Sequence, residues 1–312
     1  MNSAVLLVLV LLASFALAVV VLAGLVALLW RAVARRRRWS SLELLALRLL
    51  PAGGALLIAL SVVLPAFLRY EPLGEHEAVG PWLWGLASLA AACLVHGLWR
   101  GARACRAARA LLERCGPAAP RRAGPGQMIE VVDSPEPLVA VVGAWRPRLV
   151  AAASVRAACT PEEFRAVLAH EMAHLAARDN LKLLALFAAP DVLAWTPLAG
   201  CLTVRWRAAA EHEADERATG AVCERRLALA AALIKVARLV QKDDGAHPAL
   251  GMPVAADDVV GRVRELLAPP ARAPRRGLAP ALLAAALLLP LLALPGYALV
   301  HELIERLVAL GS

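Results

Sequence analysis

Two histidines and a glutamate have the spacing of a metal-dependent hydrolase. The stretch TPEEFRAVLAHEMAHLAARDN contains His170, Glu171 and His174 in an H-E-x-x-H pattern. Helical residues four positions apart lie almost one above the other, so the two imidazoles can bind one metal ion. Glu171 then lies beside the metal, where its carboxylate can hold a water molecule. Two neutral histidines, an open position and a carboxylate base form the arrangement of zinc hydrolases.

The residues around this pattern predict a helix. Thr160 suits the N-cap, Pro161 suits the first helical position, and Glu163 completes a capping box with Thr160. Apolar side chains recur at helical spacing through the stretch, at Phe164, Val167, Leu168, Met172 and Leu175. Without a third ligand, however, the two histidines would be ordinary residues on a solvated helix face.

A second acidic stretch supplies candidates for that third ligand. In the run RAAAEHEADERA, Glu211 and Asp215 are four residues apart and share a helix face, whereas Glu213 points elsewhere. A zinc site of two histidines and one carboxylate also needs an acid that accepts the other N–H of a ligand histidine. We therefore expect Glu211 to bind Zn²⁺ and Asp215 to orient a histidine, with His170 the more natural choice. The alternative is a charged, solvated helix face.

Four segments together resemble a known family. They are GAWRPRLV (143–150), HEMAHLAARDN, WTP (195–197) and EHEAD, and they are similar to the membrane zinc proteases of the β-lactam sensor-transducer (BlaR/MecR) type. In that family a G-x-x-x-P strand precedes the active-site helix, and Arg, Asp and Asn follow H-E-x-x-H. The resemblance covers about Met128–Leu267 and the apolar spans around it. HtpX-like and prenyl-protein proteases share H-E-x-x-H and E-x-x-x-D, so the flanking residues favour the sensor-transducer type.

The resemblance implies a role for each residue of the two motifs. His170, His174 and Glu211 would be the zinc ligands, Glu171 the catalytic base, and Asp215 the acid behind a ligand histidine. The family's β-lactam sensors carry a large penicillin-binding domain after the last span. Only residues 301–312 follow the last predicted span here, and they contain no S-x-x-K serine site, so we do not expect direct antibiotic sensing to carry over.

The composition indicates a multi-pass membrane protein. Hydrophobic residues make up 60% of the chain. Long uncharged runs predict transmembrane helices at 1–30, 49–68, 78–99 and 278–300. Arginines follow the first and third spans, and an acidic loop follows the second. By the positive-inside rule, the N-terminus is outside the cell membrane, the protease domain is cytoplasmic, and 301–312 is a short extracytoplasmic tail.

The cytoplasmic zinc metalloprotease domain is expected at 100–268. Short strands are predicted at Met128–Asp133, Leu138–Val142 and Arg148–Ala152, and linkers at 116–126 and 268–277. The apolar segment 183–204 is long enough to be a span, but Glu211 would then lie on the opposite side of the membrane from His170. We interpret it as buried or membrane-dipping. The fold class is therefore a mainly α multi-pass membrane protein with a gluzincin-like α+β protease domain.

These features predict an integral membrane zinc endopeptidase in regulatory or signalling proteolysis. Its partners would be the lipid bilayer and a protein substrate such as a cytoplasmic repressor. The sequence leaves open whether the protein forms a homo-oligomer. Direct nucleic acid binding is not expected, because the basic residues lie close to the spans.

An HtpX-like quality-control protease and a non-catalytic signal transducer are the alternatives. Candidates for an oxyanion donor are His212, Arg217 and His247.

The cysteines favour none of these alternatives. None of the six forms a C-x-x-C, and all fall in membrane or cytoplasmic segments. Reduced thiols are therefore expected, and zinc binding by cysteine is not.

Overall fold

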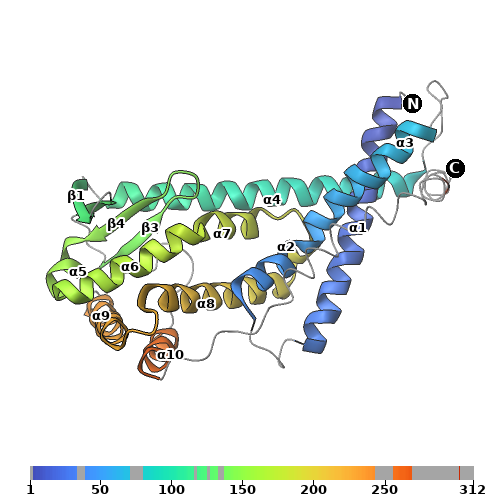
Figure 1. The fold of residues 1–312 in the computed structure, drawn as a ribbon. Coiled ribbons are helices and arrows are strands. Elements are labelled where there is room, and N and C mark those ends of the chain that lie inside the picture. Colours follow the sequence, from blue (N-terminus) through green and yellow to red (C-terminus); the bar gives the residue numbers. More distant parts are fainter. Residues whose placement is uncertain are drawn as a thin grey trace. The chain divides into compact units, whose positions relative to one another are not determined.

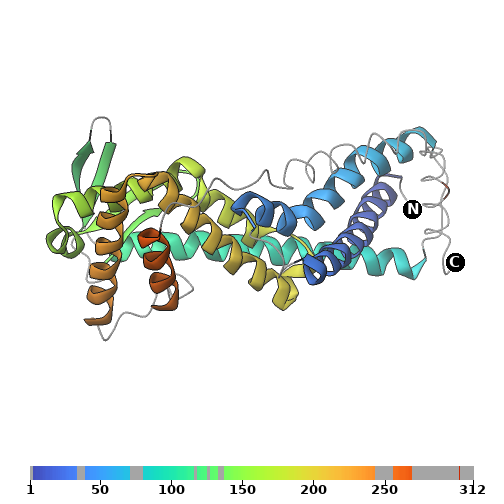
Figure 2. The same cartoon turned by 60° about the horizontal axis from the view of Figure 1, so that its bottom comes forward.

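The computed structural model describes residues 3–33, 39–70, 80–115, 118–124, 127–132, 137–242, 256–268 and 302. The described chain is mostly helical, with a four-stranded sheet (Figures 1 and 2). It divides into two compact units, which we describe separately. One contains the residues up to Arg100 and Leu186–Arg205, and the other contains Gly101–Ala185 and the residues from Trp206 onward. Apart from Ala268 and Glu302, the predicted linker 268–277, span 278–300 and tail 301–312 lie outside the described residues.

Three helical segments that begin in the first unit are long and apolar enough to cross a membrane: Ser3–Ala32, Ser41–Arg69 and Pro81–Arg114. The elements that form them are α1 (Ser3–Val33), α2 (Ser41–Ile58), the π-helical η1 (Ala59–Val63), α3 (Leu64–Tyr70) and α4 (Pro81–Arg114). The side chains that pack them together are apolar, namely Leu6, Leu9, Val10, Ala13, Val63, Phe67, Leu83 and Ala87. These helices overlap the predicted spans at 1–30, 49–68 and 78–99, while their insertion and orientation in a membrane stay predictions.

The second of these helices begins earlier than the predicted span at 49–68. Ser40 and Glu43 form a capping box, so α2 starts at Ser41. Arg48, which directly precedes the predicted span, lies inside the helix and is fully buried. Its guanidinium bonds to the buried carboxylate of Asp191. The charge of Arg48 is therefore balanced inside the protein by Asp191 and not by solvent.

The apolar segment 183–204 is divided between three elements. They are α7 (Asp179–Ala188), the 3-10 helix η2 (Val192–Trp195) and α8 (Pro197–Thr219). Asp191 caps η2, because its Oδ1 accepts a bond from the N–H of Ala194 at 3.2 Å. A Cβ on Gly97 would lie 2.5 Å from the carbonyl oxygen of Ala188, so only glycine lets α4 pass this turn so closely. The segment Leu186–Arg205 groups with the apolar helices of the first unit.

The sheet of the second unit has the strand order β1-β2-β4-β3. Its strands are β1 (Ala118–Gly124), β2 (Gln127–Val132), β3 (Val139–Val142) and β4 (Arg148–Ala152). β2 and β4 are parallel, while β1 and β3 run antiparallel to their neighbours. The three predicted strands are present. The predicted linker 116–126 is wrong in part, because β1 occupies most of it, and Pro120 is tolerated there since β1 lies at the sheet edge.

The sheet lies between two helical layers of the same unit. On one face Leu149 and Ala151 pack against Leu168 of α6 (Pro161–Ala177). On the other face Val142 and Val150 pack with apolar residues from the end of α4, namely Ala108, Leu111 and Leu112. The far side of α6 contacts α9 (Cys223–Lys242) and α10 (Ala256–Leu267), and the short α5 (Ala153–Ala158) follows β4. The helix with the H-E-x-x-H is thus packed on two sides.

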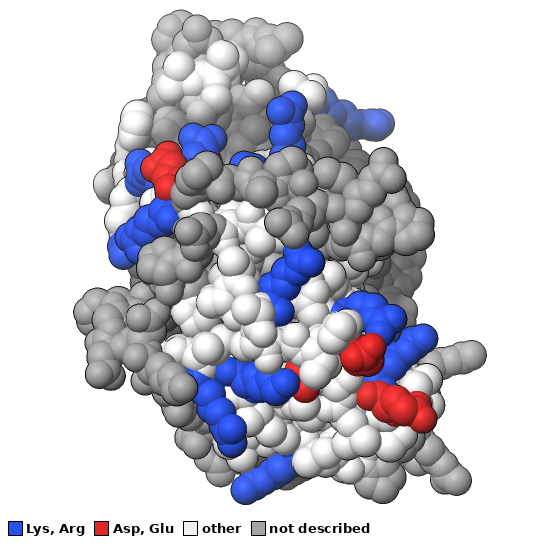
Figure 3. Space-filling model, turned by 90° about the vertical axis from the view of Figure 1, so that its left-hand side faces the viewer, with Lys and Arg blue, Asp and Glu red and all other residues white. Residues whose placement is uncertain are grey.

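Basic side chains are spread over one face of the described chain. On the face shown in Figure 3, Lys and Arg occur at several separate places, and Asp or Glu lie beside some of them. Among the described residues on this face, the basic side chains do not form one continuous stripe.

Candidate metal centre

Helix α6, which carries the H-E-x-x-H residues, forms as its sequence predicts. The N–H of Glu163 donates to the Thr160 hydroxyl at 3.2 Å, and the N–H of Thr160 donates to the Glu163 carboxylate at 2.8 Å. Pro161 occupies the first turn, where its missing N–H costs nothing. The helix therefore starts at a defined residue, and this start fixes which side chains face the sheet and which face α8.

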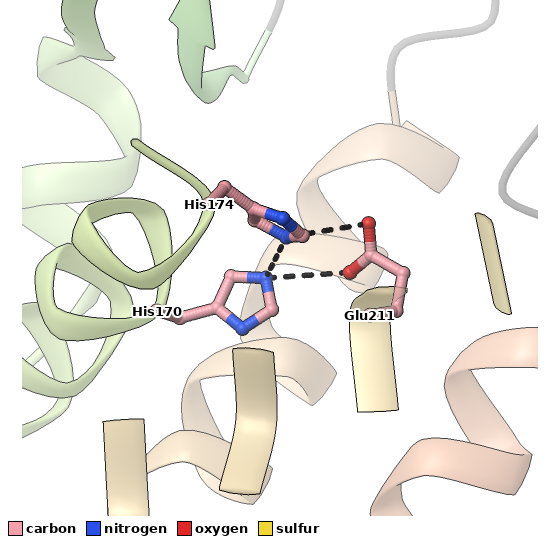
Figure 4. A group of neighbouring side chains, drawn as sticks. All are labelled: His170, His174 and Glu211. Carbon is pink, nitrogen blue, oxygen red and sulfur yellow. Dashed lines mark hydrogen bonds and ion pairs between the residues drawn. The ribbon is translucent and has the colours of Figure 1, made fainter. Parts of the chain in front are cut away.

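Three predicted ligands meet where α6 faces α8. Nε2 of His170 lies 3.1 Å from Nε2 of His174, which is one turn further along the helix. The carboxylate of Glu211 on α8 faces both rings, with Oε2 at 3.3 Å from His170 Nε2 and Oε1 at 3.5 Å from His174 Nε2. Figure 4 shows both imidazoles pointing toward this carboxylate. The three side chains form a group that could hold a metal ion.

The separations within this group fit zinc. Zinc binds imidazole nitrogen at about 2.0–2.1 Å, so two ligand atoms of a tetrahedral ion lie about 3.3 Å apart. The two imidazole Nε2 atoms are 3.1 Å apart, close to that value, and they lie 3.3 and 3.5 Å from different oxygens of the Glu211 carboxylate. Two imidazoles and one carboxylate are also a ligand set of catalytic zinc sites, in which the fourth position is open.

A carboxylate lies behind each histidine. Nδ1 of His170 lies 2.8 Å from Oδ1 of Asp215, as the sequence pattern predicted. Nδ1 of His174 lies 2.8 Å from Oδ2 of Asp179, a partner that sequence reasoning missed. Because each Nδ1 faces a carboxylate, the two rings present the lone pair of Nε2 to the centre of the group once Nε2 has lost its proton. Such partners fix the tautomer and strengthen the ring as a metal ligand.

A left-handed residue places Asp179 against His174. Arg178 ends α6 with φ of 54°, so the chain turns sharply into α7. The next residue is Asp179, and the side chain of Asn180 donates to the carbonyl oxygens of Val141 at 2.7 Å and Gly143 at 3.0 Å. The signal for these two residues was present as the Arg-Asp-Asn that follows H-E-x-x-H, but its spacing alone did not indicate their contacts.

Glu171 lies between the metal group and the sheet. One of its carboxylate oxygens accepts a bond from the N–H of Val141 on β3 at 3.1 Å. Burial raises the pKa of Glu171 above its usual value, and the neighbouring histidines oppose this shift. A carboxylate with a raised pKa, held by one oxygen, is suited to take and return a proton.

The charges of the site favour a bound cation. Burial alone would lower the pKa of His174, but Asp179 and Glu211 raise it to about 10, and Asp215 and Glu211 raise that of His170. For Glu211 and Asp215, burial would raise the pKa, but the histidines and Arg262 hold it below the usual range. The carboxylates stabilise positive charge at the imidazoles. The raised pKa values mean that a proton on each ring is favoured, and a bound metal dication would supply positive charge at the same place.

Arg262 on α10 is a further residue of the site that sequence reasoning missed. Its Nη1 lies 2.9 Å from Oε2 of Glu211, and it also bonds to Asp215. Neither motif includes it, and no spacing pattern indicated it. Two of the candidates for an oxyanion donor form ion pairs with other residues. His212 pairs with Glu216 and Glu265, and Arg217 pairs with Glu213. The third candidate, His247, is outside the described residues.

The comparison with protein families agrees with this geometry. The sequence model described as BlaR1 peptidase M56 matches residues 81–266, which is more than half of the chain. The chain belongs to the BlaR1 peptidase M56 family. No curated protein and no solved structure matches it. Membership confirms the resemblance to the BlaR/MecR type and, with three apolar helices, indicates a membrane metalloprotease. The relation to HtpX-like proteases stays a prediction.

Proposed function

We propose that this M56 family protein is an integral membrane zinc endopeptidase. The observation that carries the proposal is the convergence of His170, His174 and Glu211, with a carboxylate behind each imidazole and Glu171 beside them. A non-catalytic transducer would not require a base at Glu171. Its presence beside a complete ligand set favours an enzyme.

The residues of the site have distinct roles in peptide hydrolysis. A bound zinc ion supplies a Lewis acid that polarises the peptide carbonyl and lowers the pKa of water. Glu171 accepts the proton of the attacking water and delivers it to the leaving nitrogen. Its bond to the Val141 N–H fixes one carboxylate oxygen, so the other is left to exchange the proton. Asp215 and Asp179 keep the two imidazoles in the tautomer that binds metal.

The substrate we propose is a protein segment in extended conformation, and a cytoplasmic regulator such as a repressor is the partner. β3 is an edge strand beside Glu171, where an extended peptide can add by main-chain hydrogen bonds. The N–H and C=O of Val141 already bond to Glu171 and Asn180. An added peptide would therefore use Val139, whose side chain shares a sheet face with that of Val141 and whose main chain points the same way.

The proposal is tested by proteolysis and zinc content in detergent-solubilised protein. We expect the wild type to bind about one zinc per chain and to cleave itself or casein, with cleavage lost on chelation. Glu171→Gln keeps the shape of the side chain but removes the base, so cleavage should fall by about 10²–10⁴-fold while zinc stays bound. Glu162→Gln, an exposed change on the same helix, is the matched control and should cleave like the wild type. Equal cleavage by Glu171→Gln and the wild type would contradict the proposal.

A further inference from the structure

We propose that Arg262 is a positioning residue of the metal centre, which fixes the carboxylates of Glu211 and Asp215 in the orientation that the metal requires. The inference rests on the proposed zinc site, but it does not depend on the substrate. Neither H-E-x-x-H nor E-x-x-x-D contains Arg262, and it comes from a third helix, α10.

The contacts of Arg262 join two carboxylates on α8. Nε donates to Oδ2 of Asp215 at 2.8 Å, and Nη2 donates to Oδ1 at 2.7 Å. Nη1 lies 2.9 Å from Oε2 of Glu211. All three guanidinium nitrogens thus face carboxylate oxygens. The side chains of Arg262 and Asp215 are 11% and 6% exposed, so little solvent competes for these bonds.

Through these contacts Arg262 acts on two of the three proposed ligands. It contacts Glu211 directly, its Nη2 lies 3.5 Å from Nε2 of His170, and it reaches Nδ1 of that histidine through Asp215, whose Oδ1 lies 2.8 Å away. Glu211 and Asp215 are one helical turn apart, so their negative charges repel each other. Without the guanidinium, Glu211, whose side chain is 32% exposed, would be free to turn toward solvent.

The packing of α10 fixes the guanidinium in place. Val263 and Leu266, on the same helix, pack with apolar residues of α6 and α9. Arg226 of α9 donates to the carbonyl oxygens of Leu266, Glu265 and Ala268 and so caps the end of α10. Nδ1 of His212 on α8 lies 2.7 Å from Glu265. These contacts of α10 do not involve the metal, so the position of Arg262 does not depend on a bound metal ion.

Geometry and charge predict opposite effects on metal binding. The positive charge of Arg262 repels a nearby dication, so if charge alone mattered, its removal would tighten zinc binding. If orientation matters more, its removal weakens binding. Arginine provides a planar fork with several N–H donors, whereas lysine provides one ammonium and cannot make the same three contacts. Arg262→Lys thus keeps the positive charge but removes the forked set of contacts to Asp215 and Glu211.

The test compares Arg262→Lys and Arg262→Gln with the wild type in detergent-solubilised protein. We expect zinc, titrated against a competing chelator, to bind about 10–100-fold more weakly to both variants. The visible spectrum of the Co²⁺-loaded protein should also change, because it reports the geometry of the ligands. Arg264→Gln removes the same charge from an exposed position of α10 and should match the wild type in both measurements.

Two results would overturn the inference. They are wild-type zinc affinity and cobalt spectrum in Arg262→Lys, or tighter zinc binding in Arg262→Gln. If Arg262→Gln does not fold, the lysine variant alone decides. The readouts do not need proteolysis, so they separate this inference from the proposed function. A folded wild type without zinc would refute the proposed function, whereas zinc binding that Arg262→Lys leaves unchanged would refute only the role of Arg262.

Discussion

At the scale of single residues, the three residues that meet in the candidate metal centre could be predicted, but most of their partners could not. His170 and His174 stand in one short pattern, and the spacing of Glu211 and Asp215 places them on one helix face. Asp179 and Arg262 belong to no such pattern. Their roles depend on a left-handed turn and on the packing of α10, which follow from tertiary structure and not from local spacing.

Glu163 gives a prediction about pH at this scale. Burial would raise its pKa, but bonds to Lys235 and to the Thr160 N–H hold the pKa below its usual value. A group with a lowered folded pKa stabilises the fold above its unfolded pKa, about 4.3, and this contribution is lost as the pH falls through the folded pKa. Glu163→Gln should therefore reduce the unfolding free energy at pH 7 by about 1 kcal/mol, because Lys235 is partly exposed and the pair is screened.

Denaturant unfolding from pH 7 to pH 3 checks this prediction. The difference between the wild type and Glu163→Gln should shrink below about pH 4. A difference of the same size at pH 7 and pH 3 would show that the charge of Glu163 contributes nothing.

At the scale of elements, local signals predicted helix starts and strands better than turns. The capping box of Thr160 and Glu163 defined the start of α6. The strand β1 was missed because Pro120, Gly124 and the prolines and glycines on either side of the strand are typical of a linker, although a sheet edge tolerates Pro120. The end of α6 at Arg178 was also not predictable, since a positive φ is unusual for arginine.

The turn at Arg178 leads to a prediction with its own control. Glycine adopts positive φ freely, so Arg178→Gly should retain zinc and change the unfolding free energy by no more than about 1 kcal/mol. Valine is disfavoured there, so Arg178→Val should displace Asp179 from His174 and weaken zinc binding. Chelator competition on both variants measures this. Equal zinc affinity in the glycine and valine variants would mean that the turn does not position Asp179.

At the scale of the whole molecule, composition indicated the apolar helices, but it could not reveal the ion pair inside them. Arg48 marks the end of an uncharged run, so the sequence places it at a boundary. In the structure it is buried against Asp191, which lies 143 residues further along the chain. Only the three-dimensional arrangement of the first unit brings these two charges together.

This pair predicts a strong coupling between two mutations. Removing either partner leaves an uncompensated buried charge, so Arg48→Met or Asp191→Asn should each cost about 3–5 kcal/mol of unfolding free energy. The double variant should cost much less than the sum. Unfolding of the four proteins in detergent micelles gives the coupling energy, and the exposed pair Arg217–Glu213 is a control expected to give about 0.5 kcal/mol. Additive costs at Arg48 and Asp191 would contradict the buried pair.

The most direct test of the metal centre is X-ray absorption at the zinc edge of the purified wild-type protein. The account predicts about one zinc per chain with two imidazole ligands and oxygen donors at about 2.0–2.2 Å. It also predicts no zinc–sulfur distance near about 2.3 Å, because the proposed ligands are His170, His174 and Glu211 and not the cysteines. A sulfur ligand, or a folded protein that binds no zinc, would contradict the account.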